Sequence, residues 1–137
     1  GKKPVVLNRE ILGFIGNRLQ FAMLREALAL VESGVASKEA VDATVKYALG
    51  RRLATTGPLE SADLGGLDVF CSISGYLMKD LNNNSEVPAL LHETVANGKH
   101  GAKSGSGFYD WNPESLRKIM QQRENDLLEW LKKDKSS

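Results

Sequence analysis

The sequence predicts an all-α protein, a helical bundle around one long central helix. Apolar residues recur at three- and four-residue spacings in successive stretches, which is the pattern of amphipathic helices. Glycine, proline or asparagine punctuates the chain between these stretches and predicts short connections. A convincing period of two, typical of a strand, is found only near the N-terminus.

Length and composition describe an ordinary globular domain. The chain has 137 residues, 42% of them hydrophobic and 26% charged, and a formal net charge of +1. This charge argues against nucleic-acid binding. A single cysteine, Cys71, excludes an internal disulfide and leaves no cysteine cluster for a metal. No signal peptide is visible and no apolar run reaches about 18 residues, so we expect no membrane span and a cytoplasmic location.

The first eight residues differ from the rest. Pro4–Leu7 reads as a short strand, but the chain offers no second strand for it. The strand either pairs with a second chain or is the last strand of a domain absent here, and a disordered arm is the remaining alternative. We therefore divide the chain into a residual strand or linker, residues 1–8, and a helical domain, residues 9–137.

The central helix is expected from Arg9 to Glu32, with Asn8 as its N-cap and Gly34 as its stop. A helix that is apolar on nearly all sides must be covered by partners on nearly all sides. Its apolar residues are Phe14, Ile15, Leu19, Phe21, Ala22, Met23, Leu24, Ala27, Leu28, Leu30 and Val31.

Asn17 is the polar exception on this helix. It shares one stripe with Phe21, Leu24 and Leu28. A buried amide without a partner costs about 1–3 kcal/mol, so we expect Asn17 to have a defined hydrogen-bonding role. Gly13 and Gly16, which lower helix propensity by about 1 kcal/mol each, suggest that another group approaches this backbone closely.

Caps and stop signals delimit the later helices. Ser37 is a clean N-cap for a helix that we expect to end at Gly50. After Gly57, Pro58 can occupy the first position of the next helix, which ends at Gly65-Gly66. The remaining helices are expected over residues 68–81, over 86–96 with Ser85 as N-cap, and from Pro113 into the charged C-terminal tail.

Two further segments carry residues that can meet anions. Arg51 and Arg52 can contact a phosphate or carboxylate, but cations at a helix end are the more common explanation. The glycine-rich stretch 98–111 lacks the strand, helix and third glycine of a dinucleotide fingerprint. We interpret it as a turn that lays aromatic residues against the helices, with Lys99 and Lys103 as possible anion contacts.

No complete catalytic set is visible in the sequence. The two histidines, His92 and His100, form no metal-ligand spacing and no nucleophile–base arrangement. Cys71 lies on or near an apolar stripe and is interpreted as a core residue. Asn17 and the turn at residues 51–58 indicate a ligand site without a complete catalytic set.

The order of short motifs identifies a family resemblance over about residues 3–111. The chain resembles the C-terminal domain of the L-3-hydroxyacyl-CoA dehydrogenases, including the 3-hydroxybutyryl-CoA type. Each motif is weak alone, but all occur in register. They are Lys3-Pro4-Val5-Val6, Gly13-Phe14-Ile15-Gly16-Asn17-Arg18-Leu19, Glu26-Ala27, Gly34-Val35-Ala36 with Asp42, Gly57-Pro58-Leu59-Glu60, Asp63-Leu64-Gly65-Gly66-Leu67-Asp68 and Lys103-Ser104-Gly105-Ser106-Gly107-Phe108-Tyr109.

This resemblance implies one half of a two-domain enzyme. In the family, an N-terminal Rossmann domain binds NAD and supplies a catalytic histidine backed by a glutamate. The helical half, similar to the C-terminal domain of 6-phosphogluconate dehydrogenase, forms much of a homodimer interface and one wall of the acyl-CoA cleft. The family's asparagine falls on Asn17, which would be catalytic and substrate-binding, and Gly57-Pro58 would lie near the acyl chain.

The chain has no dinucleotide fingerprint and no counterpart of the histidine–glutamate pair. We therefore expect NAD to be bound by the absent domain, and no oxidation of 3-hydroxyacyl-CoA by this chain alone. Two alternatives remain open. The chain can be a non-catalytic helical dimerisation module, or the same domain of a dehydrogenase for a CoA-free hydroxy acid, such as gulonate or carnitine dehydrogenase.

Overall fold

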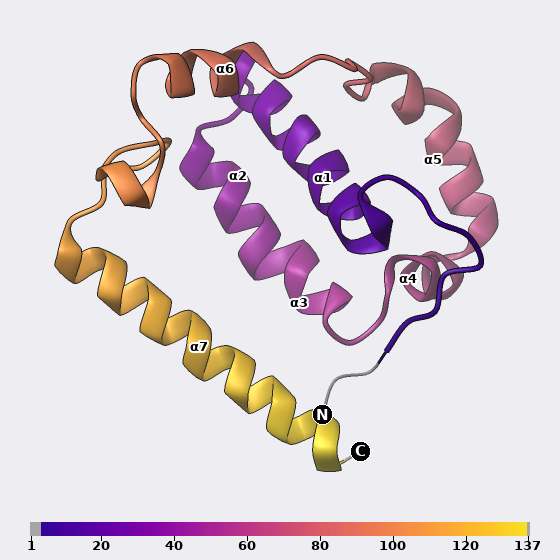
Figure 1. Ribbon diagram of the computed structural model, residues 1–137. Helices are drawn as coiled ribbons and strands as arrows, with labels where there is room; N and C mark the ends of the chain where they lie inside the picture. Colours follow the sequence, from indigo (N-terminus) through magenta and orange to yellow (C-terminus); the bar gives the residue numbers. More distant parts are fainter. Residues whose placement is uncertain (1–3, 137) are drawn as a thin grey trace. The chain divides into compact units, whose positions relative to one another are not determined.

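A computed structural model describes residues 4–136, and all regular structure in this range is helical (Figure 1). The all-α class is therefore confirmed. The elements are α1 (Phe14–Glu32), α2 (Lys38–Thr44), a π-helical segment (Val45–Leu49), α3 (Gly50–Leu53), α4 (Pro58–Gly65), α5 (Leu67–Asp80), α6 (Ala89–Ala96), a 3-10 turn (Ala102–Ser104) and α7 (Pro113–Ser136).

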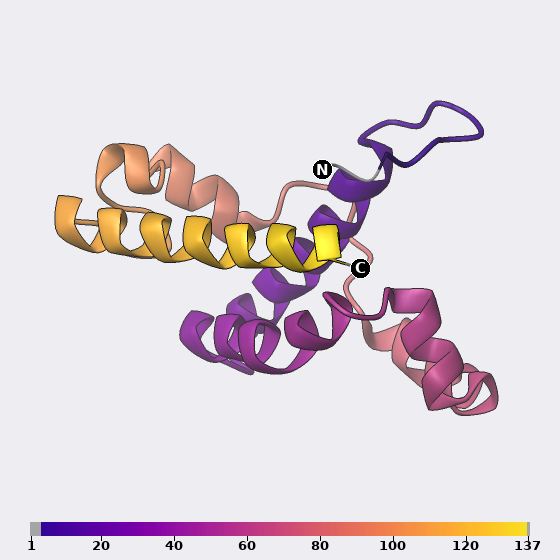
Figure 2. The ribbon, with the colours of Figure 1, turned by 90° about the horizontal axis from the view of Figure 1, so that it is seen from below.

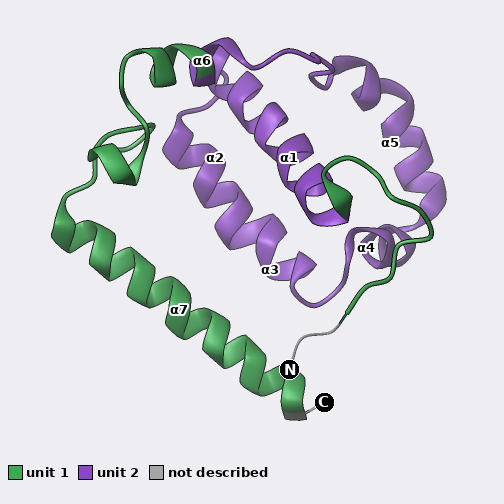
Figure 3. Ribbon diagram, viewed as in Figure 1, with its two compact units in different colours: residues 1–14, 92–137 green, residues 15–91 purple. Residues whose placement is uncertain are grey.

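The chain divides into two compact units (Figure 3). Unit 2 is the continuous stretch of residues 15–91, which holds nearly all of α1 and the helices through α5. Unit 1 combines residues 1–14 with residues 92–137 and contains α7. Asn17, Gly57 and Pro58 all belong to unit 2, so the candidate site is described within that unit.

The N-terminal expectations need correction. Pro4–Leu7 forms no strand, because no second strand is present in the described chain to complete its hydrogen bonds. The central helix begins at Phe14 rather than at Arg9, so Asn8 is not its N-cap. Gly13 and Phe14 have φ values of 80° and 49°, a left-handed conformation that interrupts any helix arriving from Arg9.

Burial along α1 is uneven. Residues 14–23 are exposed, whereas residues 24–31 are half-buried or buried, with Leu28 only 5% exposed. In the described chain, close packing joins each element to the next: α2 to the π-helical segment, that segment to α3, α3 to α4, and α4 to α5. Helix α1 takes part in none of these pairs. The other helices of unit 2 therefore do not cover the first half of α1.

The next helix starts as the sequence predicts. The Ser37 hydroxyl accepts a hydrogen bond from the Ala40 amide at 3.2 Å. Hydrogen bonding from its own backbone amide, supported by the Ser37 hydroxyl and the Lys38 charge, lowers the pKa of the Glu39 carboxyl.

Gly50, however, does not end this helix, which continues through the π-helical turn to Leu53. A Cβ at Gly50 would lie 2.8 Å from the Val45 carbonyl oxygen, so glycine permits the wider π-helical turn to close there.

The next two helices, α4 and α5, are delimited by the proline and the glycines that the sequence predicts. Pro58 occupies the first turn of α4, and the Gly57 amide donates to the Glu60 carboxylate at 2.8 Å. Gly66, with φ of 91°, separates α4 from α5. The expected break at Gly65-Gly66 is confirmed, because a residue with a side chain rarely adopts this conformation.

The second half of α1 is hydrogen-bonded to the α5–α6 connector and to the first turn of α6. The Asn82 amide donates to the Glu26 carboxylate at 2.8 Å, and the Leu90 amide donates to Glu32. The helix expected to begin at Glu86 begins instead at Ala89. The Asn82 and Asn84 side chains accept from the amides of Asn84 and Glu86, which favours a loop over a first helical turn. Pro88 further disfavours helical backbone at Val87.

Unit 1 contains a folded glycine-rich loop followed by one long helix. The Ser104 hydroxyl accepts from the His100 amide at 2.8 Å and lies 2.9 Å from the Ser106 carbonyl oxygen, to which it donates. A Cβ at Gly107 would lie 2.7 Å from the Gly101 Cα, so this glycine allows the two sides of the loop to approach each other. Asn112 accepts from the Ser115 amide and caps α7, which Figure 2 shows as one uninterrupted helix.

Candidate functional site

Asn17 lies on the exposed first half of α1. Its stripe becomes progressively more buried along the helix: Asn17 is exposed, Phe21 is 62% exposed, and Leu24 is half-buried before Leu28 becomes buried. Within residues 4–136, the side-chain amide of Asn17 makes no hydrogen bond. The Asn17 side chain is therefore exposed, and both its oxygen and its nitrogen are available to an external group, so its expected hydrogen-bonding role stays a prediction.

The glycines beside Asn17 have different roles from the one expected. A Cβ at Gly16 would meet nothing within 4 Å, so no group of the described chain approaches this backbone. Gly13 supplies the left-handed backbone at the entrance of α1, and the Phe14 amide donates to the Ile11 carbonyl at 3.1 Å. Phe14 itself has φ of 49°, which costs about 1–3 kcal/mol for a bulky residue. The first turn of α1 is therefore strained as well as exposed.

The Gly57-Pro58 turn is held by its own polar side chains. The Thr56 and Ser61 hydroxyls lie 2.9 Å apart, and Glu60 accepts from the Gly57 amide. A Cβ at Gly57 would be in ordinary contact with Glu60 at 3.7 Å, so packing within the chain does not require glycine here. No hydrogen bond in the described chain joins this turn to Asn17. The placement of both beside one ligand stays a prediction.

Arg51, one of the two arginines of α3, has a partner within the chain. The Arg51 guanidinium lies 5.1 Å from the centroid of the Tyr47 ring, a cation–π geometry. Tyr47 belongs to the π-helical segment, so the two side chains lie one helical turn apart on the same face. Lys99 and Lys103 belong to the loop of unit 1. Their expected contact with an anion stays a prediction.

Other reactive groups do not form a second site. Among the described residues, no cluster of three or more histidine, cysteine or carboxylate side chains could hold a metal ion. Cys71 is a free, exposed thiol on α5, so its interpretation as a core residue is wrong. The same range of residues contains no helix both long and apolar enough to cross a membrane.

Comparison with protein-family models shows to which family the chain belongs. Residues 13–111 match the family model of the 3-hydroxyacyl-CoA dehydrogenase C-terminal domain. The chain therefore belongs to this family and represents its C-terminal domain. The matched range includes Asn17, Gly57 and Pro58, and it ends just before α7.

Individual relatives extend the comparison. The chain is 37% identical over 128 residues to 5-formyl-3-hydroxy-2-methylpyridine 4-carboxylate 5-dehydrogenase of Mesorhizobium japonicum, covering 93% of this chain and 41% of that protein. It is 38% identical over 112 residues to a probable 3-hydroxybutyryl-CoA dehydrogenase of Deinococcus radiodurans, covering 81% of this chain and 39% of that protein. The human mitochondrial hydroxyacyl-coenzyme A dehydrogenase is 40% identical over 113 residues, covering 81% and 35%.

A solved structure shows the same fold. The crystal structure of 5-formyl-3-hydroxy-2-methylpyridine 4-carboxylic acid 5-dehydrogenase, described as an NAD⁺-dependent dismutase, matches with a TM-score of 0.88 and 37% identity. The match covers 90% of this chain and 40% of that one. The chain thus spans about two fifths of the length of the relatives it matches.

Proposed function

We propose that this chain is the substrate-side half of an NAD-dependent dehydrogenase that oxidises an L-3-hydroxyacyl-CoA to the 3-ketoacyl-CoA. The observation that carries the proposal is the exposed, unpartnered amide of Asn17 within the family-matched segment. An amide on an otherwise apolar, uncovered helix half has the chemistry of a substrate-orienting group. It can donate through its nitrogen and accept through its oxygen at the same time.

Oxidation of a secondary alcohol removes a hydride from carbon and a proton from oxygen. NAD, bound by a domain outside this chain, would accept the hydride, and a base from that domain would accept the proton. Asn17 would donate to the reacting oxygen and orient it toward the base. In this role, Asn17 fixes the angle between substrate and base, which accelerates the reaction more than it strengthens binding.

The Gly57-Pro58 turn is proposed to contact the acyl chain. Leu59, the next residue, is 82% exposed, and Leu64 at the far end of α4 is also exposed. Exposed leucines beside a turn fixed by Glu60 and Ser61 offer apolar surface without requiring the backbone to move.

A second copy of the chain is the proposed partner for much of the exposed apolar surface of the first half of α1. Phe14, Ile15, Leu19 and Phe21 are each between 46% and 62% exposed on one helix. Exposed apolar side chains gathered on one element indicate an interaction surface. The expected homodimer would cover part of this surface, and the NAD-binding domain would face the remainder around Asn17.

A CoA-free carboxylate is the second candidate substrate class. It is supported by the Mesorhizobium japonicum relative, whose name specifies a pyridine carboxylate and whose match covers more of this chain than the 3-hydroxybutyryl-CoA dehydrogenase match does. The two candidates share the reaction class and differ in what the site recognises beyond the reacting carbon.

Amide chemical shifts of the isotopically labelled chain test the site and separate the two substrates. We expect 3-hydroxybutyryl-CoA to shift the Asn17 side-chain amide and the backbone amides of Gly57 and Leu59, with free 3-hydroxybutyrate giving smaller shifts. Stronger shifts from CoA-free carboxylates would favour the second candidate.

The control is Gln20→Ala, an exposed change on the same helix that should leave the shifts unchanged. If neither ligand class moves these amides at millimolar concentration, the site assignment is wrong. The chain alone should form no NADH from 3-hydroxybutyryl-CoA and NAD.

A further inference from the structure

Positive charge is concentrated in the segment that leads into the Gly57-Pro58 turn. Residues 43–59 contain three basic residues and no acidic one. Arg51 is engaged with the Tyr47 ring. Arg52 is exposed, and its guanidinium makes no hydrogen bond and no ion pair within the described chain. Arg52 therefore keeps all of its N–H donors for an external acceptor.

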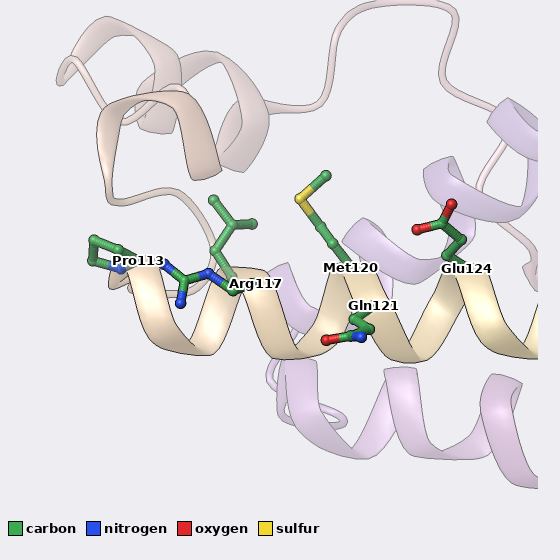
Figure 4. Close-up of a pocket in the computed structure, with 6 residues that line it drawn as sticks. Pro113, Arg117, Met120, Gln121 and Glu124 are labelled. Atoms are coloured by element: carbon green, nitrogen blue, oxygen red, sulfur yellow. The ribbon is translucent and has the colours of Figure 1, made fainter.

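The arginines of α7 show the more common arrangement. Arg117, which lines a hollow of about 450 Å³ on α7 (Figure 4), lies three residues after Glu114 in the sequence. Opposite charges at this spacing are neighbours on a helix surface and attract each other. Arg52 lacks such a neighbour, because the positions three and four residues to either side of it are apolar or threonine. Its charge is therefore not compensated along its own helix.

The backbone of Arg52 is hydrogen-bonded to the residues that form the turn. Its carbonyl oxygen accepts from the Thr55 and Thr56 amides at 3.0 and 2.9 Å, and from the Thr56 hydroxyl at 3.3 Å. The Thr56 hydroxyl also lies 2.9 Å from the hydroxyl of Ser61, in the first turn of α4. These bonds fix the base of the Arg52 side chain relative to Gly57-Pro58, while the side chain itself is exposed.

We propose that Arg52 recognises a carboxylate on the substrate, beside the acyl-chain contact at Gly57-Pro58. This inference rests on the proposed function, because it requires that the turn contacts the substrate. A guanidinium binds a carboxylate through two parallel N–H bonds, which gives geometric specificity as well as charge. The carboxylate can belong to a CoA-free hydroxy acid or to the far end of the acyl chain of a thioester. Arg52 would select substrates that carry this group in either class.

A cation near the end of a helix also has a structural use, since it interacts favourably with the helix dipole. Arg51 and Arg52 both lie in the last turn of α3, so this effect and the effect of net charge are closely similar for the two. A difference between two variants that each remove one of these arginines therefore reports on ligand recognition.

Titrations of the isotopically labelled full chain, followed by amide and arginine side-chain chemical shifts, test the proposal with two matched pairs of ligands. 3-Hydroxyglutaryl-CoA differs from 3-hydroxybutyryl-CoA by a terminal carboxylate, and 3-hydroxybutyrate carries the carboxylate that its methyl ester lacks. In at least one pair, we expect the carboxylate-bearing ligand to bind about tenfold more tightly and to shift the Arg52 Nε–H signal. The pair that shows this preference identifies the source of the carboxylate.

Substitutions at the two arginines assign the preference to one side chain. Arg52→Gln should abolish it, and Arg52→Lys should restore part of it, because an ammonium keeps the charge and loses the planar fork. Arg51→Gln is the matched control and should retain the full preference. Both residues are exposed, so circular dichroism should show unchanged helix content in each variant. An equal loss of preference in Arg51→Gln would overturn the proposal.

The remaining outcomes separate this inference from the proposed function. If 3-hydroxybutyryl-CoA shifts the signals of Asn17 and Gly57 but neither pair shows a carboxylate preference, the role of Arg52 is refuted and the proposed site stands. If coenzyme A alone shifts the Arg52 Nε–H signal as strongly as the preferred ligand, Arg52 binds a phosphate and the proposal is overturned. If no ligand shifts any of these signals, both the inference and the proposed site are wrong.

Discussion

The two halves of α1 have similar apolar composition and different surroundings. Residues 24–31 are half-buried or buried, and this half of the helix is hydrogen-bonded to the α5–α6 connector through Glu26 and, at its end, to the first turn of α6 through Glu32. Residues 14–23 are exposed, begin with a strained backbone at Phe14, and carry Asn17. The comparison teaches that apolar periodicity identifies a surface that must be covered, but not whether the same chain supplies the cover. The half with the candidate site is the half that the helices of unit 2 leave exposed.

The largest expected difference between the two halves of α1 is in how much side-chain truncation lowers the free energy of unfolding. Leu28→Ala should lower the free energy of unfolding by about 2–4 kcal/mol, because it opens a cavity at a buried position. Leu19→Ala removes a side chain of the same size from the exposed half and should change the free energy of unfolding by less than about 0.5 kcal/mol.

Urea denaturation measures both values, at a dilution where sedimentation shows a single copy. Equal losses for Leu28→Ala and Leu19→Ala would mean that the first half is covered within the chain after all.

A smaller effect is expected from the polar ties of the second half. Glu26→Gln replaces the charged acceptor of the Asn82 amide by a neutral one, and should cost about 1 kcal/mol. Gln20→Ala, on the exposed half, is the control and should cost less than about 0.5 kcal/mol. If Glu26→Gln unfolds at the same urea concentration as the parent, the connector is not held by this bond.

The smallest expected effect on stability is that of Asn17→Ala. Because the amide is exposed and makes no hydrogen bond in the described chain, its removal should change the free energy of unfolding by less than about 1 kcal/mol. Thermal unfolding followed by circular dichroism gives the value. A loss of 2 kcal/mol or more would identify Asn17 as a structural residue instead.

Local signals made much of the fold predictable. Ser37, Pro58 and Pro113 begin or cap helices as expected, and the stop signals at Gly34 and Gly66 lie at helix ends. These residues act through backbone conformation or the nearest turn, so their effect does not depend on distant partners.

The errors occurred where tertiary context decides. Gly50 carries the helix onward because its missing side chain makes room for a π-helical turn, a role that resembles a stop signal in sequence. Ser85 was a plausible cap, but the neighbouring asparagines hold a loop up to Pro88. The apolar stripe of Asn17 predicted a hydrogen-bonding role for its amide, but the stripe alone does not reveal where along the helix burial ends.

The family was identifiable from the order of motifs, and the family match over residues 13–111 confirms it. The role of Asn17 was inferred from the same resemblance, and it stays a prediction because the groups that would complete the site belong to another domain. Composition and spacing within this chain cannot specify the substrate, since the exposed residues near Asn17 define only one wall.

The turnover number of Asn17→Ala in the enzyme that joins this chain to its NAD-binding domain tests the central claim most directly. The account predicts that kcat falls about 100-fold while KM changes by less than about threefold, because the amide acts mainly on the geometry of the transition state. An unchanged kcat in a correctly folded variant would contradict it.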